Sequence, residues 1–241
     1  MSKIINFEGL PGVGKTTALS FVKSKLTDVG IRCVSTSDLL YYKGDRVGEK
    51  IYDIMRYGND AFMRLDYPYI EAFLSQAIRF NIVFETLEKG KEFDVILEDR
   101  GLDTYFSYML ARISKEQKKS YEEIICWLEK LNEFCEVQYT CSILLKDELN
   151  ECRKRYERKN EKQLSKDDWT FLFDVSKAYD FLAKKYKRIS VINVTGSANS
   201  LLYCFKIIDI NAPINPIPII FTMFSIFLFP LQIKHCSYRI K

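Results

Sequence analysis

Glycines, a lysine and a threonine near the start of the chain have the spacing of a phosphate-binding loop. Gly9, Gly14, Lys15 and Thr16 match the P-loop pattern Gly-x-x-x-x-Gly-Lys-Thr within "FEGLPGVGKTT". Glycines let backbone N–H groups surround phosphates, the lysine adds positive charge, and the threonine hydroxyl can ligate Mg²⁺. We therefore predict that the loop binds ATP with Mg²⁺. The residues predicted to contact ATP are Gly9, Leu10, Pro11, Gly12, Val13, Gly14, Lys15, Thr16 and Thr17.

A second set of candidate functional residues follows a later apolar run, in "FDVILEDR" at residues 93–100. Phosphoryl transfer uses a metal ion held by an acid at the end of a neighbouring strand, and Glu98 and Asp99 are the candidates. Arg100 comes next, and its planar guanidinium can grip a phosphate with two donors. An Asp-Arg pair on the surface is the simpler interpretation, but the P-loop upstream favours a catalytic one.

Strands that alternate with helices must position these groups. Short apolar runs predict strands at residues 4–7, 31–34, 93–97, 142–145 and 190–194, with helical stretches between them. This alternation predicts an α/β fold: a P-loop NTPase three-layer fold with a five-stranded parallel sheet flanked by helices. Ligands of such sheets bind beyond the carboxyl ends of the strands, where the P-loop lies.

Three stretches together resemble the thymidylate kinases, within the wider superfamily of nucleoside and nucleoside-monophosphate kinases. They are "FEGLPGVGKTT", "EAFLSQAIR" at residues 71–79 and "LEDRGLDTYFSY" at residues 97–108. The resemblance spans roughly residues 3–195. It implies that Arg79 and Arg100 hold an acceptor monophosphate, that Asp99 lies near Mg²⁺ with Thr16, and that Thr104 takes the place of a small hydroxyl residue in the family's Asp-Arg motif.

A basic segment, residues 148–168, follows the fourth predicted strand. Such a charge run is usually a solvated helix face. In the superfamily that the chain resembles, this segment is a helical lid whose arginines close over the triphosphate and neutralise developing charge. We select Arg153 and Arg158 as the lid arginines that act with Lys15 and Arg100 in catalysis.

The acceptor separates two classes of kinase. A monophosphate is already anionic near neutral pH and needs positioning, whereas a nucleoside hydroxyl needs a carboxylate that removes its proton. Asp38 could be that carboxylate, a substrate-binding acid after the second strand, or a helix cap. The chain departs from thymidylate kinases at Pro11, where the family usually has an acid, and at Ser37, where it usually has an arginine.

These features favour a nucleoside monophosphate kinase that converts dTMP to dTDP. Another monophosphate stays open, because proline also occurs at the Pro11 position in adenylate-kinase-like loops. The alternatives are a deoxynucleoside kinase and a non-catalytic P-loop regulator, although the Asn-Lys-x-Asp motif of GTPases is absent from the sequence.

The amino-acid composition bears on the binding partners and the cellular compartment of the protein. The net charge of +4 is weak evidence for nucleic-acid binding, and seven scattered cysteines with one histidine favour a reducing, cytoplasmic compartment over zinc or disulfides. We expect a kinase domain at residues 1–209 and an apolar tail at residues 210–241. The tail is charge-free from residue 211 to 233, long enough for a membrane anchor, but four prolines leave an intramolecular strap or a non-catalytic extension open. A homodimer is also left open.

Overall fold

The computed structural model describes residues 2–36, 46–57, 60–133, 139–194 and 198–211. Two groups of predictions lie outside these residues: the substrate-binding acid Asp38 with the neighbouring Ser37, and the apolar tail from residue 212 onward. The division into a domain at residues 1–209 and a tail stays a prediction.

Five parallel strands form one sheet, as the sequence predicts, in the order β2-β3-β1-β4-β5. Their bounds are β1 (Lys3–Glu8), β2 (Cys33–Ser35), β3 (Val95–Asp99), β4 (Tyr139–Lys146) and β5 (Ile189–Asn193). Strands β1 and β3 extend further toward their carboxyl ends than predicted. In this extension Phe7 of β1 pairs with Asp99 of β3. The polar residues Glu8, Glu98 and Asp99 therefore belong to the sheet rather than to the loops that follow it.

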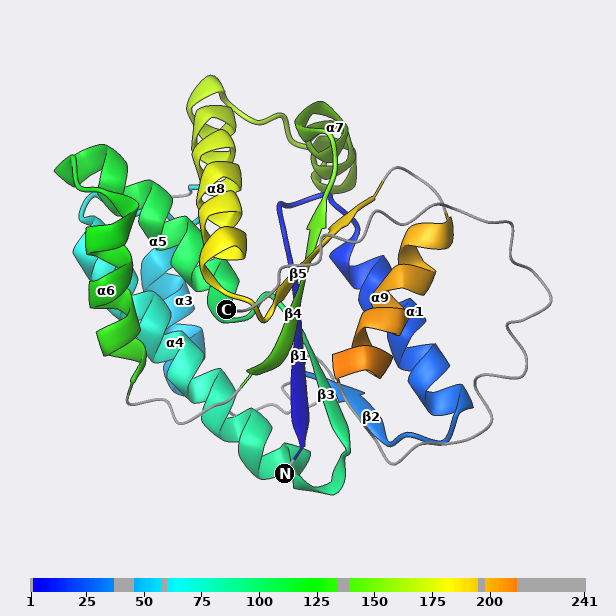
Figure 1. The fold of residues 1–241 in the computed structure, drawn as a ribbon. Helices are drawn as coiled ribbons and strands as arrows, with labels where there is room; N and C mark the ends of the chain where they lie inside the picture. Colours follow the sequence, from blue (N-terminus) through cyan, green and yellow to red (C-terminus); the bar gives the residue numbers. More distant parts are fainter. Residues whose placement is uncertain (1, 37–45, 58–59, 134–138, 195–197, 212–241) are drawn as a thin grey trace, which may run out of the picture.

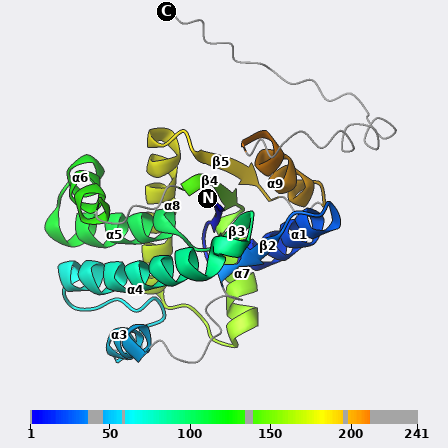
Figure 2. The same ribbon diagram turned by 90° about the horizontal axis from the view of Figure 1, so that it is seen from below.

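Helices cover both faces of the sheet, which gives the predicted three layers (Figure 1). Helices α1 and α9 lie on one face, and α4, α5, α6 and α8 lie on the other, as the view from below also shows (Figure 2). Helix α7 lies at the carboxyl edge of the sheet. The bounds are α1 (Lys15–Asp28), α3 (Arg46–Arg56), α4 (Pro68–Lys89), α5 (Leu102–Gln117), α6 (Tyr121–Asn132), α7 (Leu149–Asn160), α8 (Lys166–Lys185) and α9 (Ala198–Asn211), with a 3₁₀ turn at Gly90–Glu92.

Alternate strand residues separate two hydrophobic cores. Ile5 and Phe7 of β1 point toward α1 and α9, where they join Val22 and Ile143 in one cluster. The opposite face packs against α5 and α8, in a cluster that includes Leu110. This arrangement follows from the two-residue repeat of side-chain direction in a strand.

A band of buried polar side chains interrupts the second core near the carboxyl edge. Asn6 and Glu98 are register partners on neighbouring strands, and both are at most 5% exposed. At the start of α5, the Asp103 carboxylate accepts hydrogen bonds from both terminal nitrogens of Arg188 and from the hydroxyl of Ser142 at 2.6 Å. Because a buried charge is costly unless it is paired, these bonds hold the first turn of α5 at a defined place on the sheet.

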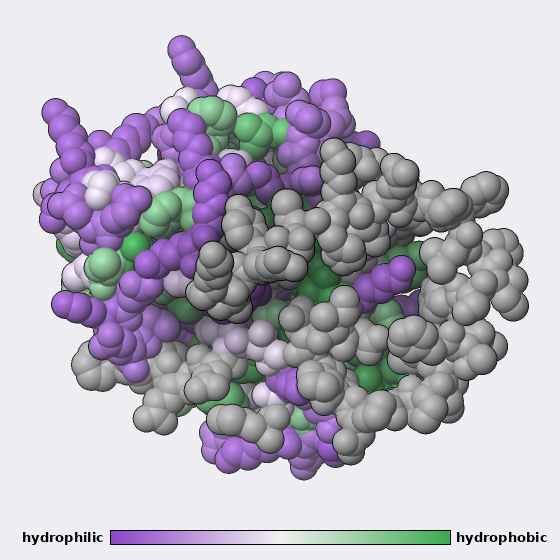
Figure 3. Space-filling view, in the orientation of Figure 1, coloured by the Kyte–Doolittle hydropathy of each residue, from purple (hydrophilic) through white to green (hydrophobic). Residues whose placement is uncertain are grey.

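The outer surface is mostly hydrophilic on the face shown in Figure 3, with apolar residues in smaller areas between the charged ones. Among the described residues, no helix combines the length and the apolar character that crossing a membrane would require.

Candidate active site

The P-loop joins β1 to α1 and has the backbone geometry that its glycines predict. Gly9, Gly12 and Gly14 all have positive φ values, from +80° to +130°, a region that residues with a Cβ rarely adopt. The Lys15 side chain bends back over the loop, and its Nζ donates to the carbonyl oxygens of Gly9 at 3.1 Å and Leu10 at 3.0 Å. Burial lowers the pKa of Lys15 to about 7, and a bound anion would favour its protonated, positively charged form.

Helix α7 packs directly on the P-loop at Gly12. A Cβ atom added to Gly12 would lie 2.2 Å from the carbonyl oxygen of Cys152 and 3.1 Å from the backbone nitrogen of Tyr156. Glycine therefore serves two purposes here, the positive φ and the close approach of a neighbouring helix. The predicted lid segment thus includes a helix that lies against the phosphate loop.

Replacing Gly12 with alanine should push α7 away from the P-loop. We expect ATP to bind about tenfold more weakly or worse, and the free energy of unfolding to fall by about 1–3 kcal/mol because of the backbone strain. Calorimetric titration with ATP and urea denaturation measure the two effects. Gly30→Ala is the matched control, because Gly30 also has a positive φ of +79° but has nothing within 4 Å of its added Cβ. An unchanged ATP affinity in Gly12→Ala would contradict the seating of α7 on the loop.

The predicted magnesium ligands lie next to each other. The Thr16 hydroxyl donates to Oδ2 of Asp99 at 3.1 Å, which links the start of α1 to the end of β3. Oδ1 of Asp99 is buried and has no hydrogen-bond partner within the described part of the chain. A hydroxyl and a carboxylate with a free oxygen fit the oxygen ligands that Mg²⁺ prefers.

Arg100 stands at a sharp turn between β3 and α5. Its φ of +71° is unusual for a residue with a Cβ. Two backbone donors hold the turn: the N–H of Arg100 donates to the Phe7 carbonyl at 3.1 Å, and the N–H of Gly101 donates to Glu8 at 2.9 Å. The end of β1 therefore fixes the direction in which the Arg100 side chain leaves the sheet.

Glu8 is a buried carboxyl group that connects three elements. It is 1% exposed, and it accepts hydrogen bonds from the N–H of Gly101 and the hydroxyl of Thr104, which also lies 2.8 Å from the hydroxyl of Tyr179 on α8. Burial, with a further contribution from the nearby Asp103, raises the pKa of Glu8 to about 8. Glu8 thus holds the Arg100 turn in place rather than facing either of the cavities described below.

The raised pKa of Glu8 predicts a pH-dependent stability. The folded chain retains a proton on Glu8 that the unfolded chain releases above about pH 4.5, so stability falls as the pH rises toward 8. Glu8→Gln keeps an acceptor for Gly101 but does not titrate. We expect the variant to lose less stability than the wild type between pH 5 and 8, by at least about 1.4 kcal/mol, the equivalent of one pKa unit.

Urea denaturation at pH 5, 6.5 and 8 measures this difference. Glu122→Gln, on the exposed surface of α6, is the control and should follow the wild type. Parallel pH profiles for Glu8→Gln and the wild type would show that Glu8 is ionised throughout this range.

Two cavities meet at the carboxyl edge of the sheet. The first has a volume of about 380 Å³ and surrounds the P-loop, with Lys15, Thr16 and Asp99 in its wall. The second, of about 330 Å³, extends between α4, α5 and the segment at residues 61–63, and its wall includes Arg79. Among the described residues, both cavities are lined by Pro11, Arg100 and Tyr156. The two cavities therefore lie side by side, with Arg100 at their boundary.

Comparisons with known proteins agree with this geometry. No family model matches the chain. The thymidylate kinase of Thermoanaerobacter sp. (strain X514) is 27% identical over 192 residues, which cover 77% of this chain and 86% of that protein. The thymidylate kinase of Pelotomaculum thermopropionicum is 36% identical over 110 residues, or 44% of this chain and 47% of that protein.

Solved thymidylate kinases have the same fold. The Candida albicans enzyme superposes with a TM-score of 0.63 over 87% of this chain and 92% of its own, at 19% identity. The Ehrlichia chaffeensis enzyme gives a TM-score of 0.57 over 88% and 99%, at 15% identity. The chain is thymidylate kinase-like. Its five-stranded parallel sheet is the sheet of that fold, which confirms the fold and the resemblance predicted from the sequence.

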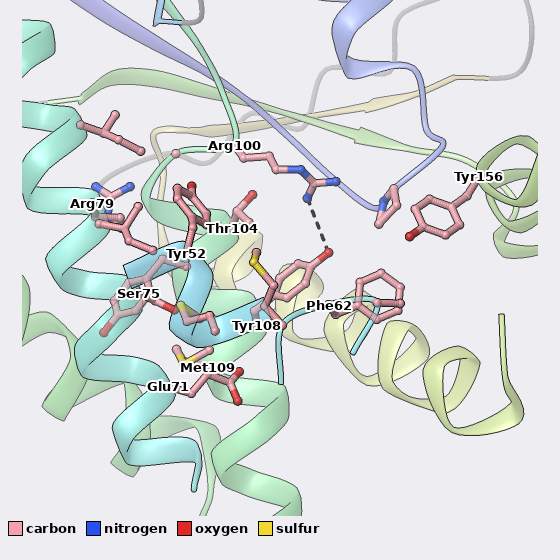
Figure 4. A pocket seen from close by; sticks show the side chains of 18 residues that line it. Tyr52, Phe62, Glu71, Ser75, Arg79, Arg100, Thr104, Tyr108, Met109 and Tyr156 are labelled. Atoms are coloured by element: carbon pink, nitrogen blue, oxygen red, sulfur yellow. Dashed lines mark hydrogen bonds between the residues drawn. The ribbon is translucent and has the colours of Figure 1, made fainter. Parts of the chain in front are cut away.

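Arg79 and Arg100, which the resemblance assigns to the acceptor, come from different elements and both line the second cavity. Arg100 borders both cavities, whereas Arg79 borders the second cavity alone and donates to the hydroxyl of Tyr139 at 2.5 Å. Figure 4 shows the Arg79 guanidinium at the opposite end of this cavity from Tyr156, while that of Arg100 points toward Tyr156. Thr104 also lines the second cavity, and its hydroxyl donates a hydrogen bond to Glu8.

The structure does not bring Arg153 and Arg158 into the wall of either cavity. The Nε of Arg153 donates to Glu157 at 2.9 Å and its Nη2 to the Leu164 carbonyl at 3.3 Å, so it closes the turn between α7 and α8. Arg158 is exposed. Arg155 and Lys159 line the P-loop cavity instead.

The rotation of α7 explains this difference. Cys152 is the buried residue of α7 and rests on the P-loop, and residues three, four and seven positions later share its face. Those residues are Arg155, Tyr156 and Lys159. These residues can be selected by spacing only after the structure has identified Cys152 as the inward residue of α7. Glu8 and Tyr179 offer no comparable signal, because their contact joins residues far apart in the chain.

Proposed function

We propose that this thymidylate kinase-like chain transfers the γ-phosphoryl group of ATP to a nucleoside monophosphate, with dTMP as the expected acceptor. The observation that carries the proposal is the meeting of two cavities at Arg100, one at the P-loop and one beside it. Each volume suits a small-molecule ligand, since such sites start at about 300 Å³. The names of the relatives support phosphoryl transfer and dTMP as the acceptor.

The donor would occupy the P-loop cavity. The inward N–H groups of the loop and the N-terminus of α1 would hold its phosphates, and Lys15 would stabilise the transferred group. Arg155 and Lys159, which line the same cavity, would add positive charge from α7. Thr16 and Asp99 would hold Mg²⁺, which when bound neutralises charge on the triphosphate.

The acceptor would occupy the second cavity with its phosphate at Arg100. A monophosphate is already an anion near neutral pH, so the chain's task is to position it and to neutralise its charge. Arg79 lies at the other end of the cavity, where the nucleoside would lie rather than the phosphate. The apolar and aromatic residues that line this cavity, among them Met109 and Tyr105, would exclude water from the acceptor.

A panel of acceptors tests the proposal. ADP formation from Mg·ATP is measured with dTMP, dUMP, dCMP, dGMP, AMP, thymidine and deoxycytidine, each against a reaction without acceptor. We expect dTMP to give the fastest ADP formation. Turnover of thymidine without dTMP would indicate a deoxynucleoside kinase, and ATP binding that no acceptor converts into ADP formation would indicate a nucleotide-binding regulator.

The expected homodimer and the expected membrane attachment are tested separately. A homodimer is tested by sedimentation of the full chain. Membrane attachment through residues 210–241 is tested by comparing the detergent dependence of the full chain with that of a version ending at Asp209.

A further inference from the structure

Tyr156 of α7 stands where the two cavities meet. It lines the P-loop cavity with Lys159, and it lines the second cavity with Phe62 and Tyr108. The other residues common to both walls are Pro11, which belongs to the P-loop, and Arg100, which follows β3. Tyr156 is therefore the residue of α7 that lies at the boundary between the two cavities.

The polar end of Tyr156 points at the place where an acceptor phosphate would lie. Figure 4 shows its hydroxyl directed toward the part of the cavity that the Arg100 guanidinium and the Tyr108 hydroxyl also face. Arg100 Nη1 lies 3.5 Å from the Tyr108 hydroxyl. Within the described part of the chain, the hydroxyl of Tyr156 has no hydrogen-bond partner. Three donors thus converge on one small region, which suits a phosphate.

The ring of Tyr156 contacts an aromatic residue in the wall of the second cavity. Its centroid lies 6.0 Å from that of Phe62, which in turn lies 5.8 Å from Phe171 of α8. Arg64, two residues after Phe62, forms salt bridges with Asp60 and with Asp168 near the start of α8. Phe62, in the wall of the second cavity, therefore packs against Tyr156 and links that wall to α7.

We propose that the Tyr156 hydroxyl donates a hydrogen bond to the phosphate of the acceptor, beside Arg100 and Tyr108, and thereby couples acceptor binding to the seating of α7 on the P-loop. This inference rests on the proposed function. Arg155 and Lys159 lie on the same helix and line the donor cavity. An acceptor phosphate bound to Tyr156 holds them there, and by linkage bound ATP strengthens acceptor binding by the same factor.

The test separates the phosphate from the rest of the acceptor. Binding of dTMP and of thymidine to the full chain is measured by calorimetry in the presence of a non-hydrolysable ATP analogue. Tyr156→Phe removes the hydroxyl and keeps the ring. We expect this variant to bind dTMP about tenfold more weakly, which is typical for one hydrogen bond to a charged group, and to bind thymidine as the wild type does.

Tyr203→Phe is the matched control, because it removes a tyrosine hydroxyl from the exposed surface of α9 and should change neither affinity. The steady-state counterpart is a raised KM for dTMP in Tyr156→Phe with an unchanged melting temperature. Equal losses for dTMP and thymidine, or no loss for dTMP, would overturn the inference while leaving the proposed function intact. A wild-type chain that neither binds nor phosphorylates any monophosphate would overturn both.

Discussion

Lys15→Ala is expected to slow phosphoryl transfer by about 1,000-fold, the loss typical of removing a preorganised charge from a reacting phosphate or oxyanion. In the structure, the Lys15 ammonium lies over the loop within 3.1 Å of the Gly9 carbonyl and 3.0 Å of the Leu10 carbonyl. A bound γ-phosphate would offer it a full negative charge instead. ADP formation with Mg·ATP and dTMP measures the rate, and the melting curve should stay cooperative.

Lys25→Ala provides the control, because Lys25 is an exposed lysine near the other end of the same helix. It should retain the wild-type rate. A Lys15→Ala chain with the wild-type rate would show that the P-loop does not hold the reacting phosphate, and the proposed mechanism would fail.

Lys15→Ala should also change the number of protons that are taken up when ATP binds. Burial lowers the pKa of Lys15 to about 7 in the unliganded chain, and a bound triphosphate should raise it because an opposite charge favours the ammonium. ATP binding at pH 8 should therefore take up a proton, and ATP affinity should fall as the pH rises from 7 to 9. Calorimetry in buffers of different ionisation enthalpy measures this uptake, which Lys15→Ala should lack.

Arg100→Ala should lower kcat/KM for the acceptor by about 100-fold, because a charge-assisted bidentate contact contributes roughly 3 kcal/mol. Arg100 borders both cavities, and the turn that carries it is held by Phe7 and Glu8. Substitution should therefore remove the contact without altering the sheet. Arg100→Lys keeps the charge but loses the planar fork, so it should recover only part of the activity.

Initial rates at varied dTMP and saturating ATP provide the measurement. Arg158→Ala is the matched control, since this arginine is exposed on α7 and lies outside both cavity walls. We expect less than about a twofold change, as for most surface substitutions. A loss in Arg158→Ala equal to that in Arg100→Ala would mean that α7 turns a different face to the substrates than the structure shows.

Local sequence patterns predicted most of the fold. Each strand is a short apolar run, and its bounds depend on a few neighbouring residues, so the order of strands and helices could be inferred directly. The ends of β1 and β3 were less predictable, because Glu8 and Glu98 are charged and suggest a loop. They continue the strands because the pairing of Phe7 with Asp99 extends the ladder, and because the buried Glu8 carboxyl group is hydrogen-bonded to Gly101 and Thr104.

The sequence by itself determined the phosphate loop, since the spacing from Gly9 to Thr16 specifies one local turn and leads directly into a helix. It also placed Asp99 and Arg100 at the carboxyl edge of the sheet, because they follow an apolar strand. Only the tertiary structure decided which cations of α7 face that loop. The helix is polar on nearly all sides, so its own sequence does not define an inward face, and the contact of Cys152 with Gly12 sets its rotation. The presence of Arg79 and Arg100 in the wall of one cavity has a similar origin, because it depends on how α4 packs beside α5.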